Sequence, residues 1–575
     1  MDDDTRVEWR EWGAEAFAEA DRTGKPVLLS LSATWCGDCH EMDVETYAEP
    51  RIAANVNDGF VPVRVDVDRH PRVRERYNMG GFPSTVFTTP SGKLLTGATY
   101  LGPGGMRQVL DRVRETWDAK GESGGRVPRA LAGEPTPRGP VDDRIEAHVA
   151  GQLGDKYDGE FAGWGSDAKF PLPRTVEFAL KREREQALRT LDAITRNLSD
   201  GVAGGFFRYA GARNWGDVNH EKLLDSNAAL LRAFANAYLY TGDESYRDTA
   251  DAAVDFLTDG LWTGVAFGGS VGPAGGRSYY ELDAEERESA TGPRRDLTAY
   301  AGANALAVDA LLTYHAYTDD ERTREYAERT MAYLEDELLV DPESLADDER
   351  FADGAVDADA PGLAVVHYRE SDEVGEAGLL ADQARVAAAF ARAETVLGEG
   401  LDVARDAADY ALATLFDDEE GSFRDGPAAG PGLLDRPLRP LDDTVEMADA
   451  LLDLAVLADD PRYREVAREA VGAFAGAWDR IGVQVAGYGA VAGRLCRDPL
   501  VVALDAPVGS DLHRAALRVA DHEKVVVPNA TAQLEGRVGP EETTGDAAYL
   551  LVGDDAHRAE TPDDLMALVA EHASG

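Results

Sequence analysis

The sequence predicts a multidomain protein with an N-terminal α/β module, an all-α region of helical hairpins and a small C-terminal α/β unit. Up to about residue 120, strand-like apolar runs alternate with patterns of helical period. A stretch rich in Gly and Pro follows, and beyond it segments of helical period come largely in pairs. A chain of 575 residues is also too long for one ordinary domain.

The N-terminal module alternates strands and helices in a distinctive order. Gly24 and Pro26 end a first helical pattern, and an apolar run typical of a buried strand comes directly after them. The predicted elements are, in chain order, a helix over 9–22, a strand over 27–31, a helix over 40–55, a strand over 60–68, a short helix to Tyr77, a strand over 85–88, a turn at 91–92 and a helix over 103–117. Their order, βαβαββα, is that of a thioredoxin fold.

A domain boundary is expected between Gly121 and Pro140, where the chain places five Gly and four Pro without periodicity. Such a composition is typical of a linker. The predicted division is an α/β module over 1–120, a linker over 121–140, a helical region over 141–490 and a small α/β unit over 491–575.

Beyond the linker, Ala- and Leu-rich segments of helical period dominate. They cover 174–198, 222–241, 243–258, 296–318, 320–339, 379–397, 401–415, 442–458 and 461–480. Paired helices with long connections indicate a stack of helical hairpins, either an open solenoid or a closed α/α toroid. The loops over 260–295, 341–378 and 417–441 are long for a compact domain, and long loops commonly line a site or stay flexible. The last unit has predicted strands over 500–504, 524–527 and 549–552 and helices over 510–520 and 562–572.

The charge of the chain limits its partners and its setting. Acidic residues outnumber basic ones by 107 to 58, and only eight of the basic residues are lysines. A surface this negative repels phosphate, so we expect no nucleic-acid partner, and the Lys depletion indicates a salt-adapted, haloarchaeal-type protein. No stretch is long and apolar enough for a membrane span, and the acidic start Met1-Asp2-Asp3-Asp4 is unlike a secretory signal. We therefore expect a cytoplasmic protein without a membrane partner.

Two of the three cysteines form the motif Cys36-Gly37-Asp38-Cys39, while Cys496 is alone. The pair follows a predicted strand and begins a predicted helix, whose N-terminus stabilises a thiolate. Cys36 is expected to be exposed and to act as the nucleophile. Cys39 is placed to attack a mixed disulfide at Cys36 and to release the reduced target.

Three other interpretations of these cysteines stay open. A CxxC can be half of a structural zinc site, although the chain has no second CxxC. Read with His40, the motif also matches the CxxCH signature of haem attachment. The pair can, finally, be two buried and inert cysteines.

The residues around the cysteines favour redox chemistry. Trp35 and the CxxC together resemble the Trp-Cys-Gly-Pro-Cys of thioredoxins, and Pro83 stands where thioredoxin-like proteins carry a cis proline beside the active cysteine. Trp35 and Pro83 are therefore expected in the substrate groove. The buried acid that thioredoxins carry six residues before the first Cys is Ser30 here, so deprotonation of Cys39 needs another base. Asp38 replaces the central Pro, and its charge disfavours a Cys36 thiolate.

A wider resemblance follows from motifs that occur in order along the chain. They are Glu45-Thr46-Tyr47, Val65-Asp66-Val67-Asp68, Gly80-Gly81-Phe82-Pro83, Gly97-Ala98-Thr99-Tyr100, Gly163 to Pro171, and Gly204 to Tyr209 followed by Trp215. The chain resembles the family of long thioredoxin-domain proteins known as DUF255 or spermatogenesis-associated protein 20. The resemblance covers residues 9 to 240 and implies an α/α toroid similar to six-hairpin glycosidases and sugar epimerases.

The resemblance also implies a pocket in the toroid. Carried over position by position, its candidate residues are Asp167, Lys169, Arg208, Tyr209, His220, Glu221 and Lys222. The family's His and Asp positions in the motif around Glu221 are Asn219 and Ser226 here, which weakens a sugar-enzyme assignment. The alternative role of these residues is structural, as ion pairs and caps at the ends of hairpins.

Two functions are therefore predicted. The first is a thiol-disulfide oxidoreductase or redox-responsive protein that acts on a protein or small-molecule thiol or disulfide through Cys36 and Cys39. The second is a carbohydrate-binding or sugar-modifying toroid with an accessory thioredoxin module. Neither function needs a metal or another cofactor, and none is expected.

Overall fold

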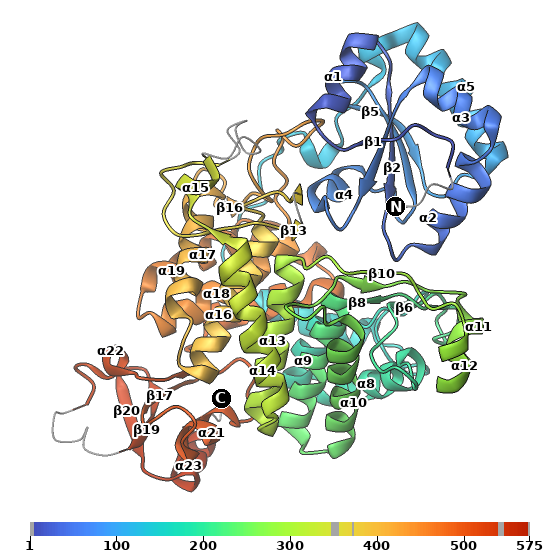
Figure 1. The fold of residues 1–575 in the computed structure, drawn as a ribbon. Coiled ribbons are helices and arrows are strands. Elements are labelled where there is room, and N and C mark those ends of the chain that lie inside the picture. Colours follow the sequence, from blue (N-terminus) through green and yellow to red (C-terminus); the bar gives the residue numbers. More distant parts are fainter. Residues whose placement is uncertain (1–4, 347–355, 371–372, 539–545, 573–575) are drawn as a thin grey trace.

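The computed structural model describes residues 5–346, 356–370, 373–538 and 546–572 of the chain. It contains an N-terminal α/β module, a ring of paired helices and a C-terminal sheet with helices, which confirms the predicted fold class (Figure 1). The module and the C-terminal unit lie on opposite sides of the ring (Figure 1). Within these described ranges, no helix is both long enough and apolar enough to cross a membrane.

The N-terminal module is built on a five-stranded sheet with the order β1-β3-β2-β4-β5. Its elements are β1 (Arg10–Glu11), α1 (Ala14–Thr23), β2 (Val27–Ser32), α2 (Gly37–Met42), α3 (Pro50–Gly59), β3 (Val61–Asp66), α4 (Pro71–Tyr77), β4 (Ser84–Thr88), β5 (Leu94–Ala98) and α5 (Pro103–Lys120). Strands β1, β2 and β3 are parallel, whereas β4 runs antiparallel to β2 and β5. Every residue of β2 is buried, as its apolar run predicts.

Two predicted helices of the module were wrong in extent. The helix predicted over 9–22 begins only at Ala14, because Arg10 and Glu11 pair with β3 as an edge strand. The helix predicted over 40–55 is two helices. A wider turn over Asp43–Tyr47 follows α2, and α3 begins at Pro50, since proline has no N–H to donate and is tolerated only in the first turn of a helix.

The all-α region is a closed ring of six helical hairpins. The inner helices are α7 (Pro173–Arg182), α9 (Leu224–Thr241), α13 (Ala301–Thr318), α16 (Leu380–Leu397), α18 (Leu441–Leu457) and α20 (Ala486–Cys496), and each packs against the next, α20 closing on α7. The outer helices are α8 (Arg184–Leu198), α10 (Glu244–Asp255), α14 (Glu321–Tyr333), α17 (Leu401–Thr414), α19 (Pro461–Gly472) and α6 (Asp143–Lys156). Of the two architectures left open, the toroid is the correct one.

The hairpin that closes the ring was missed. It pairs α6 with α20, from the two ends of the helical region. Helix α20 contains Gly487, Gly489 and Gly493, and glycines inside a helical pattern indicate a break. Here they permit close contact, because a Cβ on Gly489 would lie 2.9 Å from the Val149 side chain of α6. The segment predicted as one helix over 174–198 is likewise two helices, α7 and α8, separated at Glu183.

The C-terminal unit has a four-stranded sheet with the order β18-β17-β19-β20. Its elements are β17 (Val501–Asp505), α21 (Asp511–Leu517), β18 (Val525–Val527), α22 (Thr531–Leu534), β19 (Ala547–Val552), β20 (Asp555–Ala559) and α23 (Pro562–His572). The strand β20 was not predicted, because its residues are mostly polar. It forms a hairpin with β19, whose last residue Val552 pairs with Asp555.

The three long loops reach from the ring to the N-terminal module. Asp425, in the loop over 417–441, accepts hydrogen bonds from Arg76 of α4 at 2.6 Å and from Arg72 of α4 at 3.3 Å. All three side chains are buried. The same two arginines also donate to backbone carbonyls of this loop, among them that of Leu434 at 2.8 Å. A buried charge cluster therefore joins the two parts of the chain.

The other two loops meet the module near its cysteines. In the loop over 341–378, the His367 ring lies 2.7 Å from the backbone oxygen of Asp68. Residues 347–355 and 371–372 of this loop are outside the described part of the chain. From the loop over 260–295, Pro273 covers Gly37, and a Cβ on Gly37 would lie 3.2 Å from its Cγ. The long loops thus hold the module against the ring.

Candidate functional site

Cys36 and Cys39 lie where β2 passes into α2. Cys36 precedes the first residue of α2, and its sulfur accepts a hydrogen bond from the backbone N–H of Cys39 at 3.2 Å. The two cysteines are joined as a disulfide. The expectation of an exposed Cys36 was wrong, because only 3% of the residue is exposed. The helical ring covers this face of the module, and Cys36 faces a cavity instead of open solvent.

The surface of the module beside Cys36 is aromatic. The rings of Trp35 and Phe82 meet edge to face, with centroids 5.7 Å apart, and both line the cavity. The peptide bond between Phe82 and Pro83 is cis. Pro83 itself is buried below this surface and is not among the lining residues.

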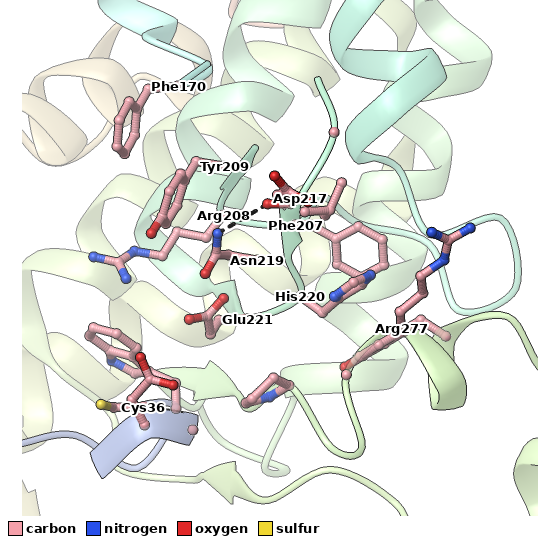
Figure 2. A pocket seen from close by; sticks show the side chains of 18 of the residues that line it. Cys36, Phe170, Phe207, Arg208, Tyr209, Asp217, Asn219, His220, Glu221 and Arg277 are labelled. Carbon is pink, nitrogen blue, oxygen red and sulfur yellow. Dashed lines mark hydrogen bonds between the residues drawn. The ribbon is translucent and has the colours of Figure 1, made fainter. Parts of the chain in front are cut away.

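The cavity lies between the module and the ring and has a volume of about 1080 Å³. Cys36 and its neighbours form one wall, and two segments of the ring form the others (Figure 2). One segment is the hairpin of β6 (Tyr209–Ala210) and β7 (Val218–Asn219) with the residues that follow it. The other is the short helix α11 (Arg277–Tyr280) with its flanks, from the loop over 260–295. Four of the predicted pocket residues line this cavity, namely Arg208, Tyr209, His220 and Glu221.

Arg208 connects the ring to the module's active-site surface. Its guanidinium carbon lies 4.4 Å from the centroid of the Trp35 ring, a cation–π contact. Its backbone N–H donates to the carbonyl of Glu221 at 2.8 Å, which fixes these two residues side by side. The neighbouring Tyr209 stacks on Phe170 with ring centroids 4.6 Å apart. This wall thus offers one cation and a pair of stacked aromatic rings.

Glu221 is a buried carboxyl with an unused oxygen. Only 8% of the residue is exposed, and its Oε2 has no hydrogen-bond partner. Burial raises the pKa of Glu221 above its ordinary value, the Arg208 charge lowers it and the Asp38 charge raises it further. A carboxyl in these surroundings can hold and release a proton closer to neutral pH than an exposed one.

His220 is held between aromatic rings. It stacks on Tyr280 with ring centroids 5.1 Å apart and meets Phe207 edge to face at 4.8 Å. Burial and the Arg277 charge lower the pKa of His220. The imidazole is therefore neutral near pH 7 and is available for hydrogen bonding.

Three predicted pocket residues do not line this cavity. Lys169 is fully buried and donates to Asp158 at 3.0 Å. Lys222 donates to Asp200 at 2.6 Å and lines a second cavity, of about 630 Å³, behind Tyr280. Asp167 is exposed. Each buried lysine is neutralised inside the ring by its own aspartate, so its side chain is directed away from Cys36.

A group of carboxyls lies beneath Trp35. Asp68, from the loop after β3, accepts a hydrogen bond from the Trp35 indole at 2.7 Å. Burial and the nearby charges of Asp66 and Asp296 raise the pKa of Asp68 to about 7, and burial raises that of Asp66 as well. Asp296 comes from the ring and accepts a hydrogen bond from Tyr300 at 2.8 Å. In the described part of the chain, no group of three or more His, Cys, Asp or Glu side chains is arranged to hold a metal ion.

The sequence did not identify the remaining lining residues. The polar ones from the ring are Arg196, Asn197, Asp217, Asn219, Arg277 and Glu281. Arg277 and Glu281 belong to the loop over 260–295, whose length was a signal for a site. Arg196 and Asn197 lie at the end of α8 and look like ordinary exposed helix residues, so the sequence contains no signal for them.

Comparison with known proteins places the module in a described family. Residues 1–131 match the model of the family described as "Protein of unknown function, DUF255". Human spermatogenesis-associated protein 20 is 31% identical over 294 residues, which cover 44% of this chain and 37% of the human protein. The match thus spans little more than a third of that relative's length. Thiol:disulfide interchange protein DsbD 1 of Pseudomonas aeruginosa is 30% identical over 103 residues, 17% of each chain.

Solved structures resemble the helical region at low identity. A sugar epimerase from a ruminal bacterium is 13% identical with a TM-score of 0.45, and the match covers 57% of this chain and 84% of the epimerase. Cellobiose 2-epimerase from Spirochaeta thermophila is 17% identical with a TM-score of 0.39, covering 57% and 83%. Likenesses at this level say nothing about activity.

Proposed function

We propose that this chain, a member of the DUF255 and spermatogenesis-associated protein 20-like family, is a thiol-disulfide oxidoreductase whose substrate binds between its thioredoxin module and its helical ring. One observation carries the proposal: Cys36 forms part of the wall of a cavity whose other walls are polar and aromatic side chains of the ring. Relatives named thiol:disulfide interchange proteins, which match the module alone, support the same chemistry.

The reaction proceeds through a mixed disulfide. In the reduced protein the Cys36 thiolate attacks a substrate disulfide, one substrate thiolate leaves, and the other half stays bound to Cys36. The Cys39 thiolate then attacks the Cys36 sulfur, the second substrate thiolate leaves, and the protein disulfide forms. The two protons of the cysteines go to the two product thiols. The substrate is thereby reduced by two electrons and the protein is oxidised by two.

The cavity favours a small substrate. Its volume of about 1080 Å³ is near the upper end of small-molecule sites. Pro273 and the β6–β7 hairpin occupy the space in front of Cys36 where a folded protein would have to dock. The lining carries both cations and carboxyls, among them Arg208, Arg277 and Glu221. We therefore propose a low-molecular-weight or short-peptide disulfide with charged groups of both signs.

A sugar-modifying activity of the ring is the second candidate. Glu221 and Asp217 line the same cavity, and enzymes that act on sugars use paired carboxyls. The stacked rings of Phe170 and Tyr209 offer an apolar surface to a sugar. This candidate gives no role to Cys36, so a Cys36 variant separates the two functions.

The test is an exchange assay on the full chain in high-salt buffer, a setting that the excess of acidic residues supports. The reduced protein is mixed with hydroxyethyl disulfide, and consumption of the disulfide is followed. Cys36→Ser should abolish the reaction, whereas Cys496→Ser, with its thiol outside the cavity, should leave it unchanged. Equal rates for Cys36→Ser and wild type would refute the proposal and favour the sugar candidate.

A further inference from the structure

We propose that Glu221 of the helical ring is the proton acceptor and donor for thiol-disulfide exchange at Cys36. This inference rests on the exchange activity proposed above and assigns it a residue outside the thioredoxin module. The module and the ring would then contribute complementary halves of one active site.

The position of Glu221 supports the assignment. The residue lies between β7 and β8 (Lys222–Leu223), and its backbone carbonyl is fixed by the N–H of Arg208. Its side chain enters the cavity from the ring, while Cys36 enters from the module (Figure 2). A substrate sulfur bound at Cys36 would lie in the space that the two residues share.

The unused oxygen of Glu221 indicates a missing ligand. A buried polar atom without a partner is uncommon in native structures, because its desolvation is not compensated. The Oε2 of Glu221 has no hydrogen-bond partner among the described residues, although the backbone of Arg208 is bonded to the Glu221 carbonyl. A thiol S–H, of the substrate or of Cys36, can donate to this oxygen.

Among the described residues of the module, no buried carboxyl lines the cavity. Ser30 occupies the position of the buried acid of thioredoxins and is buried in β2. Asp68 accepts a hydrogen bond from the Trp35 indole and is not among the residues that line the cavity. Asp38 follows Cys36 closely but is exposed to solvent. Glu221 is thus the buried carboxyl that lines the cavity together with Cys36.

The charges around Glu221 suit proton transfer. The cavity lining around it includes Arg208 just before β6, Tyr209 of β6, Asp38 of α2, the neighbouring His220, and Arg277 and Tyr280 of α11. Burial and Asp38 raise the pKa of Glu221 and Arg208 lowers it. The group therefore binds a proton more strongly than an exposed carboxylate does.

The proton moves in two steps. Ionised Glu221 takes the proton of the Cys36 thiol, and the resulting thiolate attacks the substrate disulfide. As the sulfur–sulfur bond of the substrate breaks, protonated Glu221 gives this proton to the leaving thiolate. The proton of Cys39 goes to the second leaving thiolate when the protein disulfide closes. No proton or electron is left over, and no further reactant is needed.

The experiment compares two disulfides that differ in their leaving groups. Hydroxyethyl disulfide releases a basic thiolate that needs a proton, whereas dithiobis(nitrobenzoate) releases an acidic thiolate that does not. We expect Glu221→Gln in the reduced full chain to slow the first reaction about a hundredfold, since general acid-base catalysis contributes roughly 10²–10⁴-fold. The second reaction should slow less, because it loses only the acceptor for the Cys36 proton and not the donor to the leaving thiolate. Glu221→Asp, which keeps a carboxyl, should restore part of the rate.

A matched control is Glu394→Gln on α16, because burial also raises the pKa of Glu394 and the residue does not line the cavity. It should react like wild type with both disulfides, and melting curves should show that every variant is folded. If Glu221→Gln slows neither disulfide, the assignment of Glu221 is wrong while the exchange activity stands. If it slows both equally, Glu221 does not donate the proton to the leaving thiolate, and that half of the assignment is wrong. If Cys36→Ser retains exchange, the proposed function itself fails.

Discussion

The guanidinium of Arg208, from the helical ring, lies over the indole of Trp35, the residue that precedes Cys36 in the thioredoxin module. The same arginine binds the backbone of Glu221. The Arg208 side chain therefore contacts the aromatic surface beside the disulfide, its backbone N–H fixes the carbonyl of Glu221, and its charge lowers the pKa of the Glu221 carboxyl. Changes at Arg208 should affect binding and proton transfer together.

Arg208→Met keeps an apolar stem over Trp35 but removes the positive charge. Because that charge lowers the pKa of Glu221, its loss should raise this pKa. The acid limb of the pH–rate profile with hydroxyethyl disulfide should move to higher pH. An acid limb that stays at the wild-type pH would show that Arg208 and Glu221 are not coupled in the reaction.

Thiol labelling tests access to the cavity. In the reduced protein, iodoacetamide should modify Cys36 faster than Cys39 or Cys496, because α2 stabilises its thiolate, whereas burial raises the pKa of Cys496. A bulky polyethylene glycol maleimide should modify Cys36 slowly, since the ring covers it. In Cys39→Ser, a mixed disulfide between Cys36 and a small thiol should persist and be detected by mass spectrometry. Equal labelling of Cys36 and Cys496 would contradict this picture.

The buried cluster around Asp425 should hold the module on the ring. Asp425→Ala leaves Arg76 buried without its carboxylate and Arg72 with Glu376 alone, and breaking a buried ion pair typically costs about 3–5 kcal/mol. After proteolytic cleavage in the exposed parts of 121–140, the wild-type fragments should stay together and the variant fragments should separate on gel filtration. Arg129→Ala, which removes an exposed ion pair with Glu134, is the control and should behave like wild type.

The carboxyls beneath Trp35 should make stability depend on pH. The pKa of Asp68 is raised to about 7 in the folded protein, so its protonated form favours folding. This contribution is complete below the ordinary Asp pKa of about 3.9 and is lost as the pH rises through about 7. In Asp68→Asn, the unfolding free energy should fall less between about pH 5 and about pH 8 than in wild type. Parallel curves for both proteins would contradict the expectation.

Salt should stabilise the protein. With 107 acidic and 58 basic residues the folded chain repels itself, and this repulsion weakens as the Debye length falls from about 10 Å at 0.1 M to about 3 Å at 1 M salt. Thermal melts in low and in molar KCl measure the effect, and Tm should increase with KCl. A Tm that is unchanged or lower in molar KCl would refute the prediction of salt adaptation.

Much of the architecture could be predicted from local patterns. The position of the CxxC at the junction of β2 and α2 could be predicted, because the sequence itself shows the pattern of a buried strand followed by that of a helix. The α20 helix could not be found in this way, since its glycines gain their meaning only from contact with α6. Whether the helical pairs form an open or a closed stack depends on the contact between α20 and the helices at the start of the region, which are far from it in the sequence.

The candidate site was predictable only in part. Arg208 and Glu221 were identified by resemblance, and the structure brings both to the cavity that contains Cys36. Lys169 and Lys222 belong to the same motifs but are directed to buried aspartates, a difference that the sequence does not show. The burial of Cys36 was also unpredictable, because it depends on loops that follow more than two hundred residues later.

The pairing of α6 with α20 also determines when the site can exist during synthesis. Domains generally fold in order as the chain leaves the ribosome, so the thioredoxin module can form early, with its cysteines uncovered. The ring closes only when α20, several hundred residues later, has emerged and joined α6. At typical translation rates this interval is on the order of tens of seconds. A nascent chain should therefore have an open thioredoxin-like thiol pair, and the finished protein an enclosed one.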